Sequence, residues 1–279
     1  MAEARSSIII SIFSTSSGIG KTITAINLAA SLAKEGYAVC LIDLDLQFGD
    51  IVNYLNLEPK YTIADAQLHM QMDLGNFDVK DYLTDYNYRD EGQRLNFSVL
   101  APPLKIYDAY RIDVSKVEEI IRRLNYFDFI VLDLGAVFSA LNLAMLDMST
   151  IINFLGVIDF LPSVKNFKIG YDTLIRFEYE ESKIRLVENR ADSQKLISGH
   201  DVEKLLGESF YHRLPNDFPS VSRSIHKGCP LMFAAPSSKL TESFFELAEK
   251  YTNRQQNFQS QIPESNAEGI FSRFFSLFS

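Results

Sequence analysis

The stretch Ser14-Thr15-Ser16-Ser17-Gly18-Ile19-Gly20-Lys21-Thr22 decides the fold of this chain. The apolar, mostly β-branched run IIISIF (residues 8–13) precedes it, and residues 23–34 follow it with apolar side chains at helical spacing. A strand, a glycine-containing loop and a helix in this order are the setting that a phosphate-binding loop requires. The sequence therefore predicts such a loop, rather than a glycine–serine turn with a solvated lysine.

The residue types in this loop suit a nucleoside triphosphate and Mg²⁺. Gly18 and Gly20 allow the backbone to bend until consecutive N–H groups point at one anion, and the following helix adds the positive end of its dipole. Lys21 is expected to reach the β- and γ-phosphates, and the Thr22 hydroxyl to hold Mg²⁺. We expect the nucleotide to contact Ser17, Gly18, Ile19, Gly20, Lys21, Thr22 and Ile23.

The loop departs from both usual patterns of its kind. The pattern GxxxxGK[ST] has glycine where this chain has Thr15, and the deviant form KGGxGK[ST] has lysine and glycine where this chain has Ser16 and Ser17. A lysine missing near the phosphates removes charge that would stabilise the transition state of phosphoryl transfer. We therefore expect nucleotide binding with slow hydrolysis.

The composition sets bounds on the class of protein. The chain has 279 residues, 47% of them hydrophobic and 23% charged, which is enough for one large α/β domain. A net charge of −9 disfavours a protein that binds nucleic acid backbones without regard to sequence, because such proteins need a dense field of Lys and Arg. We expect no nucleic-acid partner.

The cysteines and the apolar runs point to a cytoplasmic protein. Cys40 and Cys229 are far apart in the sequence, so we expect both to be small core residues in a reducing compartment, without a disulfide or metal role. We find no signal peptide and no run of the roughly 20 apolar residues that a membrane span needs.

Apolar runs alternate with helical periodicity along the chain. Strands are predicted at residues 8–13, 37–43, 96–100, 127–133, 151–157, 183–187 and 209–213, and helices at residues 23–34, 50–56, 61–70, 114–124, 141–148, 163–177, 201–206 and 239–251. The acidic, tyrosine-rich segment 73–94 is interpreted as a surface insertion or lid. Strands that are apolar throughout and separated by helices predict an α/β fold, with a mostly parallel sheet covered on both faces and one domain over residues 1–251.

Polar residues follow several predicted strands at their carboxyl ends, where parallel α/β sheets bind ligands. Asp133 is expected to hold Mg²⁺, while of Asp43 and Asp45 one could join the Mg²⁺ shell and the other orient the attacking water. The amide of Asn189 could read adenine. Each aspartate could instead cap a helix or turn, and Asn189 could be an ordinary turn residue.

The C-terminal residues change in character twice. Residues 252–269 are rich in Asn, Gln and Ser, which predicts a flexible linker. Residues 270–279 (IFSRFFSLFS) place most apolar side chains on one face of a predicted amphipathic helix. Such a helix suits a reversible anchor at a membrane surface, and docking on a protein partner or on the parent domain are the alternatives.

These features together resemble the deviant-Walker ATPases of the MinD/ParA group, and within it the CpaE/TadZ branch linked to pilus localisation and assembly. The resemblance covers residues 6–251. It is most specific in LIDLDLQFGDIVNYLNLEP (residues 41–59), and it extends to LPSVKNFK (161–168), ENRADSQKLIS (188–198) and RLPNDFPSVSRSIHKGCPL (213–231). The tail is similar in kind to the membrane-targeting helix at the end of MinD proteins.

The resemblance implies roles for individual residues. Lys21 and Asp45 would serve catalysis, Thr22, Asp43 and Asp133 would hold Mg²⁺, and Asn189, Arg190, Pro215 and Asp217 would flank the adenine of ATP. Family members form face-to-face homodimers around two ATP molecules, and hydrolysis releases the dimer. The extra lysine that reaches across such dimers is Ser16 here, and we expect Lys168, or Lys165, to replace it in part.

The sequence therefore predicts an ATP-dependent, dimerising protein that localises pilus or secretion machinery at the inner face of the cell membrane. The alternatives are an ATP-bound scaffold that does not hydrolyse, and a cell-division ATPase like MinD or a partitioning ATPase like ParA. An electron-transfer relative of the same fold is disfavoured, because Cys40 and Cys229 do not form a closely spaced cluster-binding set.

Overall fold

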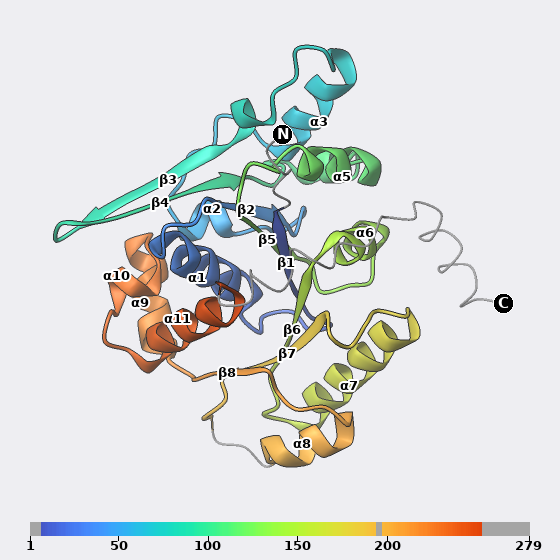
Figure 1. The fold of residues 1–279 in the computed structure, drawn as a ribbon, viewed down its shortest axis with the longest axis vertical. Coiled ribbons are helices and arrows are strands. Elements are labelled where there is room, and N and C mark those ends of the chain that lie inside the picture. The colour runs from blue at the N-terminus through green and yellow to red at the C-terminus, as the bar shows by residue number, and fades with distance from the viewer. Residues whose placement is uncertain (1–6, 194–196, 253–279) are drawn as a thin grey trace, which may run out of the picture.

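A computed structural model describes residues 7–193 and 197–252 (Figure 1). The strands are β1 (Ile8–Phe13), β2 (Val39–Leu44), β3 (Thr84–Asp90), β4 (Gln93–Leu100), β5 (Phe129–Leu134), β6 (Ile151–Gly156), β7 (Ile184–Asn189) and β8 (His212–Leu214). The helices are α1 (Lys21–Lys34), α2 (Ile51–Tyr54), α3 (Ile63–Met72), the 3₁₀ turn η1 (Val79–Tyr82), α4 (Ile106–Ala109), α5 (Val114–Arg122), α6 (Ala140–Met148), α7 (Leu161–Arg176), α8 (Gly199–Leu206), α9 (Phe218–Lys227), α10 (Leu231–Ala234) and α11 (Lys239–Thr252).

The strands form one sheet of eight, in the order β3-β4-β2-β5-β1-β6-β7-β8. Neighbouring strands run parallel, except that β3 is antiparallel to β4. This confirms the predicted α/β fold with a mostly parallel sheet. The register places Asp43 of β2 beside Asp133 of β5, so two of the predicted carboxylates lie side by side, each one residue before the end of its strand.

Helices cover both faces of the sheet because the central strands are apolar on both sides. In β5, Phe129 and Val131 pack with α1, α10 and α11 on one face, while Ile130 and Leu132 pack with α3, α5, α6 and α7 on the other. All six residues of β5 are buried. A strand without a polar face can only be stable between two layers, which is the arrangement in Figure 1.

The predicted insertion or lid at residues 73–94 is wrong in part. Residues 84–90 form β3, which pairs with β4 along its whole length and extends the sheet. The alternation that places Tyr86 inside and Asp85 and Asn87 outside is a strand period, and the Glu91-Gly92 turn is a hairpin signal. The strand period and the turn signal were overlooked because the segment is acidic and rich in tyrosine.

Several element boundaries also differ from prediction. The first helix begins at Lys21 rather than at residue 23, and the last strand is the short β8 rather than residues 209–213. Helices α9 and α10 were not predicted. The predicted linker and C-terminal helix lie outside the described residues, apart from Thr252 at the end of α11.

Candidate functional site

The loop between β1 and α1 has the backbone of an anion cradle. Gly18 has φ 69° and Gly20 has φ 95°, both in the left-handed region that glycine adopts without steric cost. Within residues 7–193 and 197–252, no acceptor is found for the backbone N–H groups of residues 17–22. These groups precede or open the 14-residue helix α1, whose dipole adds positive potential at the same place. The loop can therefore receive phosphate oxygens.

Residues from the end of β7 fasten this loop to the sheet. The Asn189 Nδ2 donates to the carbonyl oxygen of Ile19 at 2.6 Å, and the Arg190 guanidinium donates to that of Gly18 at 3.1 Å. The Oδ1 of Asn189 accepts the N–H of Arg190 at 2.9 Å. The structure thus brings both predicted residues to the loop, where they hold its backbone. Reading of adenine by Asn189 stays a prediction.

Pro215 and Asp217 lie on the segment after β8, which is tied to the segment after β7. The N–H of Ala191 donates to the carbonyl of Leu214 at 2.9 Å, and the N–H of Asn216 donates to the Asp192 carboxylate at 2.5 Å. Asp217 caps α9 by accepting the N–H of Ser220 at 3.1 Å. The predicted adenine-flanking residues therefore share one rim of the site.

Thr22 and Asp133 form the centre of the candidate metal site. The Thr22 hydroxyl donates to Oδ2 of Asp133 at 2.7 Å. Asp133 is only 1% exposed, and its Oδ1 has no hydrogen-bond partner among the described residues. Burial raises the pKa of this carboxyl group to about 7, opposed by the Thr22 hydrogen bond and by the charge of Lys21. A buried oxygen without a partner beside a hydroxyl fits Mg²⁺, which prefers hard oxygen ligands.

The described residues contain no group of three or more His, Cys, Asp or Glu side chains that could hold a metal by themselves. Mg²⁺ usually keeps several waters and takes phosphate oxygens as ligands, with one or two carboxylates from the protein. Thr22 and Asp133 are a donor set of that size.

Asp43 is held by backbone N–H groups of the loop that follows β2. The carboxyl group is fully buried, and its oxygens accept the N–H groups of Asp45 at 3.2 Å and Ile51 at 3.1 Å. Burial raises its pKa, and the nearby Asp133 charge adds to this. A Cβ on Gly49 would lie 2.5 Å from the same carboxylate. In this structure Asp43 therefore organises the loop between β2 and α2, and its role as a ligand of Mg²⁺ stays a prediction.

Asp45 is half-buried at the end of β2, where it faces the segment after β5. An ideal Cβ on Gly135 would lie 3.8 Å from Oδ1 of Asp45. The Asp45 carboxylate therefore lies at the mouth between two strand ends, the place predicted for a residue that orients water. That role stays a prediction.

Two contacts at the site were missed from the sequence. On α6, Asn142 donates from Nδ2 to the carbonyls of Gly135 at 3.0 Å and Val137 at 2.7 Å, which fixes the segment after β5. The Thr15 hydroxyl donates to the carbonyl of Asn166 at 3.0 Å, and a Cβ on Gly170 would lie 2.7 Å from Thr15 Cγ2. A lone asparagine in the apolar run ALNLAML and a glycine in mid-helix were the available signals.

Lys168 is not brought to the phosphate loop within this chain. Its ammonium pairs with Asp172 on the same helix at 2.5 Å. Gly170 faces Thr15, and a residue two positions away lies on the opposite flank of a helix. Lys165 is exposed. Substitution of the missing loop lysine by Lys168 or Lys165 stays a prediction.

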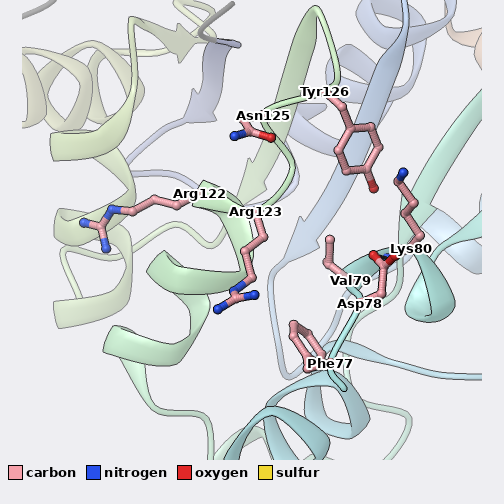
Figure 2. A pocket seen from close by; sticks show the side chains of 8 residues that line it. All are labelled: Phe77, Asp78, Val79, Lys80, Arg122, Arg123, Asn125 and Tyr126. Carbon is pink, nitrogen blue, oxygen red and sulfur yellow. Dashed lines mark hydrogen bonds between the residues drawn. The ribbon is translucent and has the colours of Figure 1, made fainter. Parts of the chain in front are cut away.

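A hollow of 320 Å³ lies away from this site, between η1 and the end of α5 (Figure 2). Lys80 lies over the ring of Tyr126 at 4.5 Å, and Arg123 lies 5.8 Å from the ring of Phe77. Asp78, Arg122 and Asn125 complete the polar lining. These cations are already engaged with aromatic rings or with carboxylates on α5, so the hollow does not offer a second set of free donors.

Among the described residues, no helix has the length and apolar character needed to cross a bilayer. Residues 10–231 match the family described as "CbiA: CobQ/CobB/MinD/ParA nucleotide binding domain". The septum site-determining protein MinD of Synechocystis is 28% identical over 234 residues, which is 80% of this chain and 81% of that protein.

Two solved structures share the fold. The ParA family ATPase of Chlorobium tepidum superposes with a TM-score of 0.76 at 21% identity, covering 87% of this chain and 99% of that one. The MinD protein of Pyrococcus horikoshii, solved in complex with Mg-ADP, gives a TM-score of 0.71 at 21% identity, covering 92% and 100%. At this identity the likeness concerns the fold.

Proposed function

Because this chain belongs to the CobQ/CobB/MinD/ParA nucleotide-binding family, we propose that it binds ATP with Mg²⁺ and acts as a nucleotide-controlled positioning protein. The observation that carries the proposal is the buried oxygen of Asp133 beside the Thr22 hydroxyl, next to the phosphate loop. Among the described residues, this oxygen has no hydrogen-bond partner and the loop N–H groups have no acceptors. The Mg-ADP complex of a MinD protein with the same fold supports it.

The site residues divide the work by position. Lys21, 8% exposed, supplies a buried cation at the start of α1, where it would neutralise the β- and γ-phosphates. Thr22 and Asp133 would hold Mg²⁺, which supplies charge neutralisation to the phosphates when bound. Asp43 sets the loop that carries Asp45, and Asp45 would orient the attacking water. Asn189, Arg190, Pro215 and Asp217 would line the adenine side.

Calorimetry tests the binding step. Wild-type protein is expected to bind ATP in the presence of Mg²⁺. Lys21→Ala is expected to lose most of this affinity, and Thr22→Ala the part that depends on Mg²⁺. Lys34→Ala, at the exposed far end of the same helix, is the matched control and should bind as wild type. If wild-type protein shows no binding heat and no thermal shift with ATP, the proposal is overturned.

We propose further that ATP joins two copies face to face. Large apolar side chains stand exposed at the carboxyl edge of the sheet, in loops and at the first residue of α9: Phe48 (72%), Val137 (63%), Phe160 (64%) and Phe218 (72%). Exposed apolar side chains around a ligand site suit a partner surface. At one protein concentration, analytical ultracentrifugation should show more association with ATP than with ADP. A protein whose association is the same with ATP and with ADP would contradict this switch.

The output we propose is placement of pilus or secretion machinery at the membrane, based on the stretches that resemble the CpaE/TadZ branch. Division-site placement or partitioning is the second candidate, and the likeness to MinD and ParA proteins favours it. Deleting the gene and scoring piliation, septum position and plasmid retention separates these outputs. A DNA-binding assay tests the partitioning mode alone.

Hydrolysis distinguishes a switch from a scaffold. With serine at position 16, we expect multiple-turnover phosphate release that is slow but dependent on Asp45 and Lys21. Asp45→Asn should abolish release while ATP still binds. If the wild type binds ATP and never turns over, the non-hydrolysing scaffold is the correct description.

A further inference from the structure

The free edge of the sheet is a hairpin with an unusual charge order. Strands β3 and β4 are joined by Glu91 (φ 45°) and Gly92 (φ 81°), a two-residue turn with both φ angles positive. Figure 1 shows the hairpin at the edge of the sheet, with β3 as the outer strand. Its inner face is anchored, because Tyr86 donates to the carbonyl of Gly228 at 3.1 Å and Tyr88 packs on Phe233.

The turn determines which backbone groups of β3 point outward. In a two-residue hairpin the pair that closes the turn, here Asp90 and Gln93, exchanges hydrogen bonds, and bonded and non-bonded pairs then alternate. Asp85, Asn87 and Arg89 fall in non-bonded pairs, so their N–H and C=O groups face away from β4. Their side chains share one face of the strand and are exposed.

From these contacts we propose that β3 pairs antiparallel with β3 of a second copy of this chain. With Asn87 at the two-fold axis, Asp85 lies opposite Arg89 of the partner subunit, and the contact occurs twice. A shift of two residues in register removes both ion pairs. A shift of four places Asp85 or Arg89 opposite the same residue of the partner subunit, which is repulsive. The charge order therefore selects one self-complementary register.

A second feature of the hairpin, its facing arginines, also supports pairing with a second copy. Arg89 is in register with Arg94 of β4, two like charges facing each other across the hairpin. Neither arginine forms an ion pair within residues 7–193 and 197–252. The partner's Asp85 would supply the missing carboxylate.

The side chains of Asp85 and Asn87, the other two outward-facing positions of β3, are held in place by β4. Ser98 holds Asp85 through a hydrogen bond of 2.9 Å, and Asn96 holds Asn87 through one of 2.9 Å.

This association needs no nucleotide, because the hairpin lies at the sheet edge and the phosphate loop lies at the carboxyl ends of the central strands. Sedimentation velocity without nucleotide, across a concentration series, is therefore the test. Wild type should show a concentration-dependent dimer. Arg89→Asp should weaken dimerisation by roughly tenfold or more, because two attractive pairs become repulsive. The double variant Asp85→Arg with Arg89→Asp should restore it, since the swapped charges are complementary again.

Two controls keep the test specific. Arg122→Asp makes the same charge change at an arginine of α5 whose side chain is 52% exposed, and should dimerise as wild type. Circular dichroism melts identify any variant that fails to fold.

Cross-linking supplies an independent measurement. Asn87→Cys should cross-link rapidly with a short bismaleimide, whereas Asn96→Cys, one strand inside on the same face, should not. Cys40 and Cys229 are buried and give no background. A wild type that stays monomeric throughout, a double variant no better than Arg89→Asp, or equal cross-linking at positions 87 and 96 would each overturn the proposal.

Discussion

Gly20 is the residue at which backbone strain and close packing coincide. Its φ is 95°, and an added Cβ would lie 2.6 Å from Nδ2 of Asn189. Gly36 has nearly the same φ, 93°, but in the described part of the chain nothing lies within 4 Å of the added atom. Comparing substitutions at Gly20 and Gly36 therefore separates two costs: that of a left-handed backbone, and that of displacing Asn189, which holds the loop.

We predict that Gly36→Ala lowers the free energy of unfolding by about 1 kcal/mol, the cost of the backbone conformation alone. Gly20→Ala should lower it by about 2–3 kcal/mol and also abolish ATP binding, because Asn189 must move. Urea denaturation and calorimetry measure the two effects. Equal losses in both variants, with ATP binding retained, would show that Asn189 does not set the loop.

His212 makes stability depend on pH. The ring is 5% exposed, its Nε2 lies 2.9 Å from the Ser243 carbonyl, and its Nδ1 lies 3.1 Å from Nζ of Lys250. Burial, aided by the Lys250 charge, lowers its pKa from 6.5 to about 4. The unfolded chain therefore binds a proton that the native protein does not, between about pH 6.5 and pH 4.

We predict that stability is complete above pH 6.5 and falls by about 3 kcal/mol as the pH drops to 4 through this group alone. His212→Gln should remove that part of the acid sensitivity, whereas His226→Gln at an exposed position should keep it. Urea titrations at a series of pH values give the comparison, and identical pH profiles for wild type and His212→Gln would contradict the assignment.

At the scale of elements, α7 presses on the phosphate loop through a residue without a side chain. An added Cβ on Gly170 would lie 2.5 Å from Cζ of Phe154 and 2.7 Å from Cγ2 of Thr15. The helix, β6 and the loop therefore meet in one tight contact.

We predict that Gly170→Ala destabilises the protein by about 1–3 kcal/mol through overpacking and weakens ATP affinity by shifting the loop. Ile169→Ala on the same helix, at a side chain 52% exposed, should change stability by no more than about 0.5 kcal/mol. The same denaturation and calorimetry assays apply. If Gly170→Ala destabilises the protein but leaves ATP affinity unchanged, the packing of α7 does not affect the nucleotide site.

The elements that could be predicted from sequence are those with a single strong signal. The buried strands β1, β2 and β5 carry continuous apolar runs, and the phosphate loop carries its own glycines. β3 was missed because its alternation lies in tyrosines among acidic residues. The hydrogen bonds that Asp43 accepts from Asp45 and Ile51 could not be predicted, because they follow from a loop path that no spacing rule gives.

At the scale of the whole molecule, the prediction that remains open concerns the C-terminal residues 253–279. The full chain should sediment with anionic liposomes, and ATP should strengthen this by coupling two tails, since two weak anchors bind far better than one. A chain ending at Tyr251 should stay in the supernatant while binding ATP as before. Equal sedimentation of the two proteins would show that the tail does not anchor the protein to lipid. The tail would then be assigned to docking on a protein partner or on the parent domain.

The burial of both thiols has a practical consequence. Cys40 lies within β2 and is 0% exposed, Cys229 follows α9 and is 1% exposed, and burial raises the pKa of each. A thiolate is needed for alkylation, so each sulfur can be modified only when its surroundings come apart. Mass spectrometry can follow the alkylation of the two sulfurs separately. The rate at Cys40 therefore reports how often the sheet centre opens, and the rate at Cys229 how often the α9–α10 corner opens. The measurement needs no substitution and can be repeated with any ligand.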